Sequence, residues 1–349
     1  MFNVDDLIML MTTRYLSRKS FSGFNLHKNP PVSKIAGIYL PPELIRNNDI
    51  LEISQDIDNE FRDAVNEFVK VLNESFSPND LTNFYNNIAS LKISFRSFFR
   101  LVYYDLIMKS KISASYLALD NKILIGDNNF LDTIYHELFH MASAVIKGDI
   151  VFSGFKQANT NYKNVSVFGY GLNEGYTQLL SERYFKLNDD VINPYYYEVH
   201  LAYHLEQIVG KDKMESLYLN ANLLGLIMEL EKYAKEDNIL KFLSYFDYIL
   251  TNSHRENTSI QKLHEALVYV NKFLVYTYAS KLKKDYENEL LSKEEVSNLL
   301  YDYFSSLGYT VILKNDEEYR YFDDDIDSFI EELLEEIIGI DEENIIVKI

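Results

Sequence analysis

Residues 130–146 read FLDTIYHELFHMASAVI, and this stretch decides how the rest of the chain is interpreted. Its apolar residues recur every three or four positions, which predicts a buried helix over the whole stretch. Residues four positions apart share one face of a helix, so His136 and His140 can reach the same metal ion. Glu137 lies next to the first of them, where its carboxylate can take a proton from a water molecule on that ion.

Such a metal site needs a third ligand, because hydrolytic zinc generally takes three protein ligands and keeps one position open. The chain has no cysteine, so only histidine and carboxylate side chains can complete the site. The extended pattern HExxHxxGxxH is excluded, since Ser143 and Ile146 stand where it requires glycine and histidine. A second predicted helix begins with the motif GLNEGYT at residues 171–177, and its Glu174 is the predicted third ligand.

The combination of HELFH with GLNEGYTQLLSER resembles the gluzincins, the thermolysin-like clan of zinc metallopeptidases, over about residues 81–233. The resemblance implies a mainly α (α+β) fold: a zincin-like catalytic domain with a small β-sheet and a two-helix zinc core. It also implies that Zn²⁺ is bound by His136, His140 and Glu174, with Glu137 as the general base in peptide-bond hydrolysis. In such domains an edge strand binds the extended substrate, a role that would fall to the hairpin predicted at residues 115–126.

Two positions near Glu174 concern the surroundings of the metal ligands. Many gluzincins carry an aspartate one turn after the glutamate ligand to orient a histidine, and Gln178 stands there in this chain. Its amide oxygen can still accept the imidazole N–H, although it raises ligand basicity less than a carboxylate. Gly175 lacks a side chain, so we expect the second helix to approach the helix of residues 130–146 closely.

Peptide hydrolysis also needs a hydrogen-bond donor for the oxyanion, commonly tyrosine or histidine in this clan. The predicted helix at residues 195–209 carries Tyr197, His200 and His204 on a shared face. Tyr197 is the first candidate for this donor and His200 the second. The pair His200 and His204 is a weaker candidate for a metal site, because residue 201 is leucine rather than glutamate.

The remaining sequence is interpreted mainly as helices, in three regions. Residues 1–80 are an N-terminal arm and helical region, residues 81–250 the catalytic domain, and residues 251–349 a helical acidic C-terminal region. Residues 149–172 are rich in glycine, asparagine and serine, which predicts a loop with one or two short extended pieces. Further helices are predicted at the following residues: 53–71, 81–108, 212–234, 238–252, 258–283, 292–306 and 323–336.

The net charge of −19 argues against a nucleic-acid partner, because phosphate contacts require clustered lysine and arginine. Most of this charge lies in residues 285–349, which hold 20 acidic and 4 basic residues. This acidic region would dock on the catalytic domain, recruit a basic partner or maintain solubility.

The first twenty residues lack the pattern of a secretory signal, and no apolar run reaches the roughly 20 residues of a membrane span. We therefore expect a cytoplasmic protein with a peptide or protein substrate and no membrane partner.

Two alternatives stay open at the level of sequence. The chain could keep the zincin fold and the metal as a catalytically silent regulatory or partner-binding module, although the intact Glu137 favours hydrolysis. It could also be a self-processing or toxin-like protease with a single protein substrate, since no specificity pocket is readable in the sequence.

Overall fold

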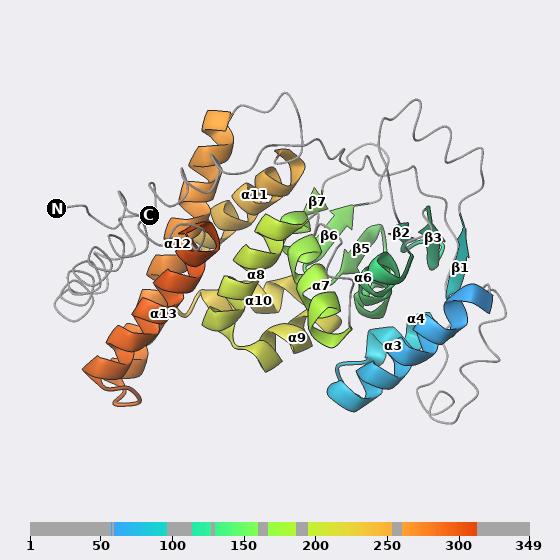
Figure 1. Cartoon of the computed structure of the whole chain (residues 1–349), viewed down its shortest axis with the longest axis horizontal. Coiled ribbons are helices and arrows are strands. Elements are labelled where there is room, and N and C mark those ends of the chain that lie inside the picture. Colours follow the sequence, from blue (N-terminus) through green and yellow to red (C-terminus); the bar gives the residue numbers. More distant parts are fainter. Residues whose placement is uncertain are drawn as a thin grey trace. The chain divides into compact units, whose positions relative to one another are not determined.

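The computed structural model describes residue 57 and the ranges 59–95, 114–126, 130–159, 167–185, 195–252 and 260–312. These residues are mainly helical, with two small sheets (Figure 1). They fall into two compact units. The N-terminal unit comprises the described residues up to Val199 together with Asp212–Gly225, and the C-terminal unit comprises His200–Lys211 and the described residues from Leu226 onward.

The first sheet of the N-terminal unit has the order β1-β3-β2. Its strands are β1 (Lys92–Phe95), β2 (Ala114–Leu117) and β3 (Lys122–Ile125). β2 and β3 are antiparallel, which confirms the predicted hairpin, and β2 forms an edge of the sheet as described. Asn121 closes the turn at φ +43°, a backbone region that asparagine tolerates better than most residues.

β1 replaces part of a predicted helix. The prediction of one helix over residues 81–108 is wrong, because α4 (Thr82–Ile88) ends and β1 follows it. β1 pairs in parallel with β3 and buries Ile93 completely. This long-range pairing outweighs the local helical spacing of apolar residues, and residues 96–108 lie outside the described part.

The helix with the HELFH motif, α6 (Phe130–Ser143), is the centre of the N-terminal unit. It contacts α3 (Arg62–Ser75), α4, the first sheet and α7 (Tyr170–Tyr184). Aromatic rings pack between α3 and α6: Phe68 packs edge-on against Phe139, with ring centroids 5.0 Å apart. At the other end of α6, the Asn87 amide donates to the backbone carbonyls of Met141 and Ala144, both at 2.7 Å. These bonds add a partner for two carbonyls at and just after the end of the helix, where the regular hydrogen bonds of the helix stop.

The second sheet follows α6 directly and has the antiparallel order β4-β5-β6-β7. Its strands are β4 (Val145–Lys147), β5 (Ile150–Ser153), β6 (Lys156–Asn159) and β7 (Val167–Phe168). Thus α6 ends three residues earlier than predicted. The predicted loop at 149–172 contains three short strands before α7 begins at Tyr170.

Each of the next three helices along the chain contains residues of both units. α8 (Tyr196–Val209) matches its prediction and contributes its first four residues to the N-terminal unit. The helix predicted at 212–234 is divided into α9 (Lys211–Leu219) and α10 (Leu223–Leu230). The break occurs because Ala221 is left-handed at φ +50° and Asn222 Oδ1 accepts from Gly225 N–H at 2.8 Å, which caps the start of α10.

The C-terminal unit is helical in its described part. Its long helices are α11 (Glu236–Asn252), α12 (Ile260–Glu287) and α13 (Lys293–Ile312), close to the predicted ranges. Phe242 of α11 stacks on Phe273 of α12, with ring centroids 4.4 Å apart. The predicted helix at 323–336 and the N-terminal arm lie outside the described residues.

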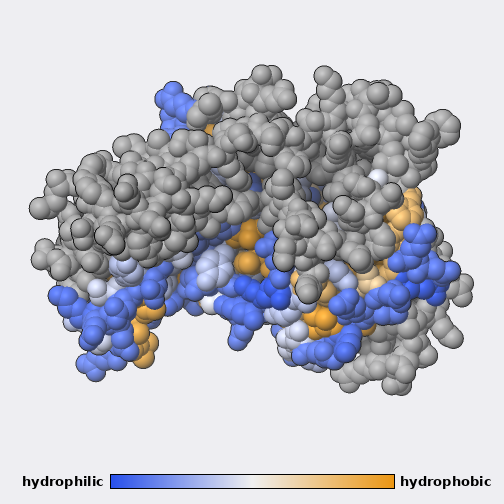
Figure 2. Space-filling view, in the orientation of Figure 1, coloured by the Kyte–Doolittle hydropathy of each residue, from blue (hydrophilic) through white to orange (hydrophobic). Residues whose placement is uncertain are grey.

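Where the described residues are visible in Figure 2, hydrophobic residues form small patches among hydrophilic ones. Within the ranges given above, no helix combines the length and apolar character that a membrane span requires.

Candidate metal centre

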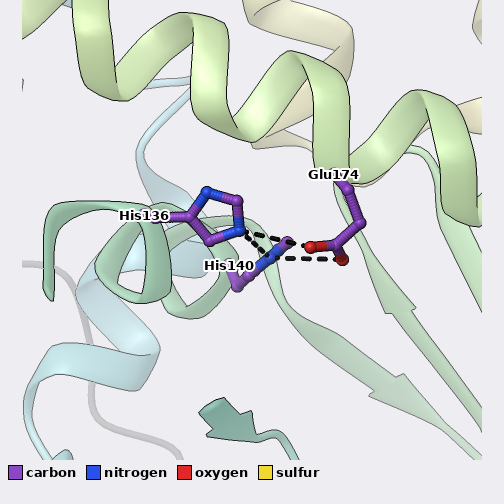
Figure 3. A group of neighbouring side chains, drawn as sticks. All are labelled: His136, His140 and Glu174. Carbon is purple, nitrogen blue, oxygen red and sulfur yellow. Dashed lines mark hydrogen bonds and ion pairs between the residues drawn. The ribbon is translucent and has the colours of Figure 1, made fainter. Parts of the chain in front are cut away.

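Three predicted ligands converge between α6 and α7. Figure 3 shows His136 and His140 extending from α6 and Glu174 extending toward them from α7. Their ligand atoms all lie within 4.8 Å of one another, and all three residues are buried. The helical spacing of the two histidines and the position of Glu174 on the next helix therefore bring together the group that the sequence indicated.

The distances within this group match a tetrahedral metal site. His136 Nε2 lies 3.0 Å from His140 Nε2 and 3.2 Å from Glu174 Oε2, and His140 Nε2 lies 3.4 Å from Glu174 Oε1. With metal–ligand bonds of about 2.0–2.1 Å, ligand atoms at the corners of a tetrahedron lie about 3.3 Å apart. The three residues thus fit a single ion, and a fourth corner remains for a further ligand.

The electrostatics of the group also favour a cation. Burial lowers the pKa of His136, but the hydrogen bond and negative charge of Glu174 outweigh it, so the pKa is raised overall. Burial acts to raise the pKa of Glu174, yet the two histidines hold it well below its usual value. A buried carboxylate that stays ionised beside two imidazoles is suited to bind a divalent cation.

The outer nitrogen of His136 has the partner that the sequence suggested. Its Nδ1 lies 3.0 Å from Gln178 Oε1, so the amide oxygen can accept the imidazole N–H. Gln178 Nε2 in turn donates to Glu182 Oε1 at 3.0 Å. Glu182 was not identified from the sequence, although it continues the four-residue spacing of Glu174 and Gln178 along α7.

The outer nitrogen of His140 has different surroundings, which the sequence did not reveal. Thr177 Oγ1 lies 3.4 Å and Asn173 Nδ2 lies 3.2 Å from His140 Nδ1. The Thr177 hydroxyl donates to the Asn173 carbonyl at 2.6 Å and lies 2.5 Å from the Tyr218 hydroxyl. A hydroxyl oxygen can accept two hydrogen bonds, so Thr177 can take one from Tyr218 and one from Nδ1–H of a metal-bound His140.

The carboxylate of Glu137 accepts a hydrogen bond from the backbone of a strand. Its Oε2 accepts the backbone N–H of Tyr116 in β2 at 2.6 Å. This bond orients the carboxylate and fixes it to the edge strand, while Oε1 is the oxygen that can take a proton. The residue as a whole is only 9% exposed, so Glu137 is largely buried.

Gly175 allows a close approach of α7 to α8, whereas a close approach to α6 was expected. A Cβ at this position would lie 2.3 Å from the carbonyl oxygen of Glu198, in the first turn of α8. The expectation that the missing side chain serves contact with α6 is therefore wrong, because the backbone of α8 takes that space. Any larger residue at position 175 would push the start of α8 away from α7.

The close start of α8 puts a tyrosine against the metal ligands. The ring of Tyr195, one residue before α8, stacks on the His136 ring with centroids 5.2 Å apart and planes at 12°. Burial, the charges of Glu174, Tyr170 and Glu137, and a hydrogen bond to Glu174 raise the Tyr195 pKa well above its ordinary value. Its hydroxyl therefore stays protonated and can donate.

The two predicted oxyanion donors are both residues of α8. Tyr197 is 3% exposed, in the first turn of the helix. His200 belongs to the C-terminal unit, where its Nε2 donates to the Leu307 carbonyl at 3.0 Å. His204, four residues on, donates from Nδ1 to the His200 carbonyl at 2.8 Å, and its Nε2 lies 2.9 Å from Ser306 Oγ. These bonds explain the His200–His204 pair without a metal ion.

Comparison of the chain with protein-family models, with curated proteins and with solved structures found no match. The interpretation of the site therefore depends on its own geometry.

Proposed function

We propose that this chain is a zinc-dependent hydrolase of peptide bonds with a gluzincin-like, zincin-type catalytic domain. The observation that carries the proposal is the convergence of His136, His140 and Glu174 at tetrahedral spacing, with the carboxylate of Glu137 next to them on α6. Two imidazole nitrogens and one carboxylate oxygen are a common ligand set of hydrolytic zinc, with one position left for water or substrate.

Zinc bound there would supply a water molecule of lowered pKa and polarise the substrate carbonyl. Glu137 then acts as the general base. The Tyr116 N–H holds one carboxylate oxygen, so the other is presented in a fixed orientation to take the proton. The same carboxyl group can afterwards deliver the proton to the leaving amine.

Tyr195 is our candidate for the oxyanion donor, in place of Tyr197 and His200. Its hydroxyl lies beside the ligand carboxylate and stays protonated because burial and nearby negative charges raise its pKa. A preorganised O–H donor at the edge of the metal site can stabilise negative charge that develops on the substrate oxygen.

The edge strand β2 supports a peptide as the substrate class. In a strand, the N–H and C=O of one residue point to the same side. The Tyr116 N–H points away from β3 to Glu137, so its carbonyl also faces the outer edge of the sheet. An extended peptide backbone could pair with this edge by strand addition and pass next to the general base.

The test is the variant Glu137→Gln, compared with the wild-type chain on a mixed peptide library after both are loaded with zinc. We expect the variant to retain zinc and to lose peptide cleavage by about 10²–10⁴-fold, because the amide cannot accept the proton. Cleavage by the variant at the wild-type rate would contradict the proposal. If the wild type binds zinc and cleaves no peptide, the alternative of a catalytically silent module would replace it.

A further inference from the structure

The contacts beyond His136 form a directed chain of hydrogen bonds. They run from the ring through Gln178 to Glu182, with both links at 3.0 Å. An amide has one accepting end and one donating end, so a glutamine between two partners can be oriented in two ways. The group at the far end of the chain decides between them.

Glu182 sets the orientation of the Gln178 amide, because an ionised carboxylate only accepts hydrogen bonds. The NH₂ group of Gln178 must face it, which turns Gln178 Oε1 toward His136. Oε1 can accept only from a protonated Nδ1. The His136 ring then carries a proton on Nδ1, and its Nε2, which lies 3.2 Å from Glu174 Oε2 and 3.0 Å from His140 Nε2, is the nitrogen left to bind a metal ion.

In the opposite orientation of Gln178, His136 could not bind a metal ion through Nε2. An NH₂ group facing Nδ1 would favour the tautomer with the proton on Nε2, and that nitrogen could not bind a metal. His140 has a different arrangement: its Nδ1 lies 3.2 Å from Asn173 Nδ2, the donating end of an amide whose oxygen accepts the Phe155 N–H, and 3.4 Å from the Thr177 hydroxyl, which can accept or donate. The two histidines therefore differ in the groups that face their outer nitrogens.

We propose that Glu182 is a positioning residue that acts through Gln178 to hold His136 in its metal-binding tautomer. The role in metal binding rests on the metal centre of the proposed function, whereas the control of the tautomer does not. Glu174, Gln178 and Glu182 follow one another at four-residue intervals on α7. One face of this helix thus supplies a ligand, the partner of a second ligand, and the carboxylate that orients that partner.

The test combines two measurements on the full chain at pH 8. Nitrogen-15 NMR of the histidine rings in chelator-treated protein reports whether Nδ1 of His136 carries a proton, with His136→Ala to assign the signal. Zinc affinity is measured by competition with a chromogenic chelator. For Glu182→Ala, we expect a mixture of His136 tautomers and zinc binding weakened about tenfold, at the lower end of the effect of outer-shell partners.

Two further variants separate positioning from a general loss of structure. Glu74→Ala removes an exposed carboxylate on α3 and should change neither measurement. Gln178→Glu gives His136 a direct carboxylate partner, so adding Glu182→Ala to it should no longer weaken zinc binding. An unchanged His136 tautomer in Glu182→Ala, or an equal loss of affinity in the Gln178→Glu background, would overturn the proposal.

The outcome is separable from the fate of the proposed function. If the wild-type chain binds no zinc, the metal centre is refuted, but the NMR measurement still shows whether Glu182 controls the His136 tautomer. If zinc binds and the tautomer is insensitive to Glu182, the positioning role is refuted while the metal centre stands.

Discussion

At the scale of single residues, Tyr195 and Tyr197 can be compared directly as candidates for the oxyanion donor. Tyr195 stacks on the His136 ring, whereas Tyr197 is buried in the first turn of α8. We expect Tyr195→Phe to lower kcat by about 10²–10³-fold with a smaller change in KM, as for the loss of one oxyanion donor. Steady-state kinetics on a cleaved peptide measure this. A larger loss in Tyr197→Phe than in Tyr195→Phe would restore the assignment made from sequence.

The sequence could not favour Tyr195 for a geometric reason. Helical spacing groups Tyr197, His200 and His204 on one face, and such grouping applies only to residues inside the helix. Tyr195 precedes α8, so its direction depends on how the chain enters the helix. That entry in turn depends on the contact between Gly175 and the Glu198 carbonyl, which joins residues on different helices.

The ligand residues themselves were accessible from sequence. The positions of His136 and His140 relative to each other follow from one turn of a helix, and Glu174 follows from the need for a third ligand near a helix start. Thr177, Asn173 and Tyr218 were not accessible, because their contacts depend on how α7 packs against α6 and α9. Glu182 had a local signal, its distance of four residues from Gln178.

At the scale of elements, the hairpin and the helices α6, α7, α8, α11 and α12 were predicted close to their observed ranges. The helices predicted at 53–71, 81–108 and 212–234 differ from the observed α3, from α4 with β1, and from α9 with α10, and the short strands outside the hairpin were predicted poorly. The hairpin of β2 and β3 is joined by a short turn, so its pattern is local. By contrast, β1 pairs with β3 from 30 residues away, and its four residues are too few to display a period. The second sheet has strands of two to four residues, which alternate too briefly to be distinguished from a loop.

The packing of α6 explains why its helix was the most secure prediction. Six residues in its described part are fully buried, so the apolar pattern reflects contacts on nearly all sides: Ile134, Leu138, Phe139, Met141, Ala142 and Ser143. The same burial leaves little freedom to the histidine side chains that share the helix. An element with such a dense core can hold ligand atoms at fixed distances.

At the scale of the whole molecule, the C-terminal unit predicts a pH dependence of stability. Burial lowers the pKa of His204 to about 3, and the neighbouring His200 also acts to lower it. The unfolded chain, with an ordinary histidine pKa of about 6.5, then binds more protons than the folded chain as pH falls. The contribution of the neutral, buried His204 to the free energy of unfolding is fully present above about pH 6.5 and is lost progressively as the pH falls toward 3.

His204 alone should reduce the free energy of unfolding by about 2 kcal/mol between pH 8 and pH 5. Urea unfolding of the chelator-treated protein at the two pH values measures the difference. The variant His204→Gln has no titrating ring and should show a smaller decrease with pH than the wild type. Equal decreases in both proteins would contradict the role of His204.

The measurement that tests the metal centre most directly is the zinc content of the purified chain after loading and removal of excess metal. Our account predicts about one zinc ion per wild-type chain, held by three protein side chains, and almost none in His140→Ala or Glu174→Ala. Equal zinc contents in the wild type and both variants would show that these side chains do not form the site.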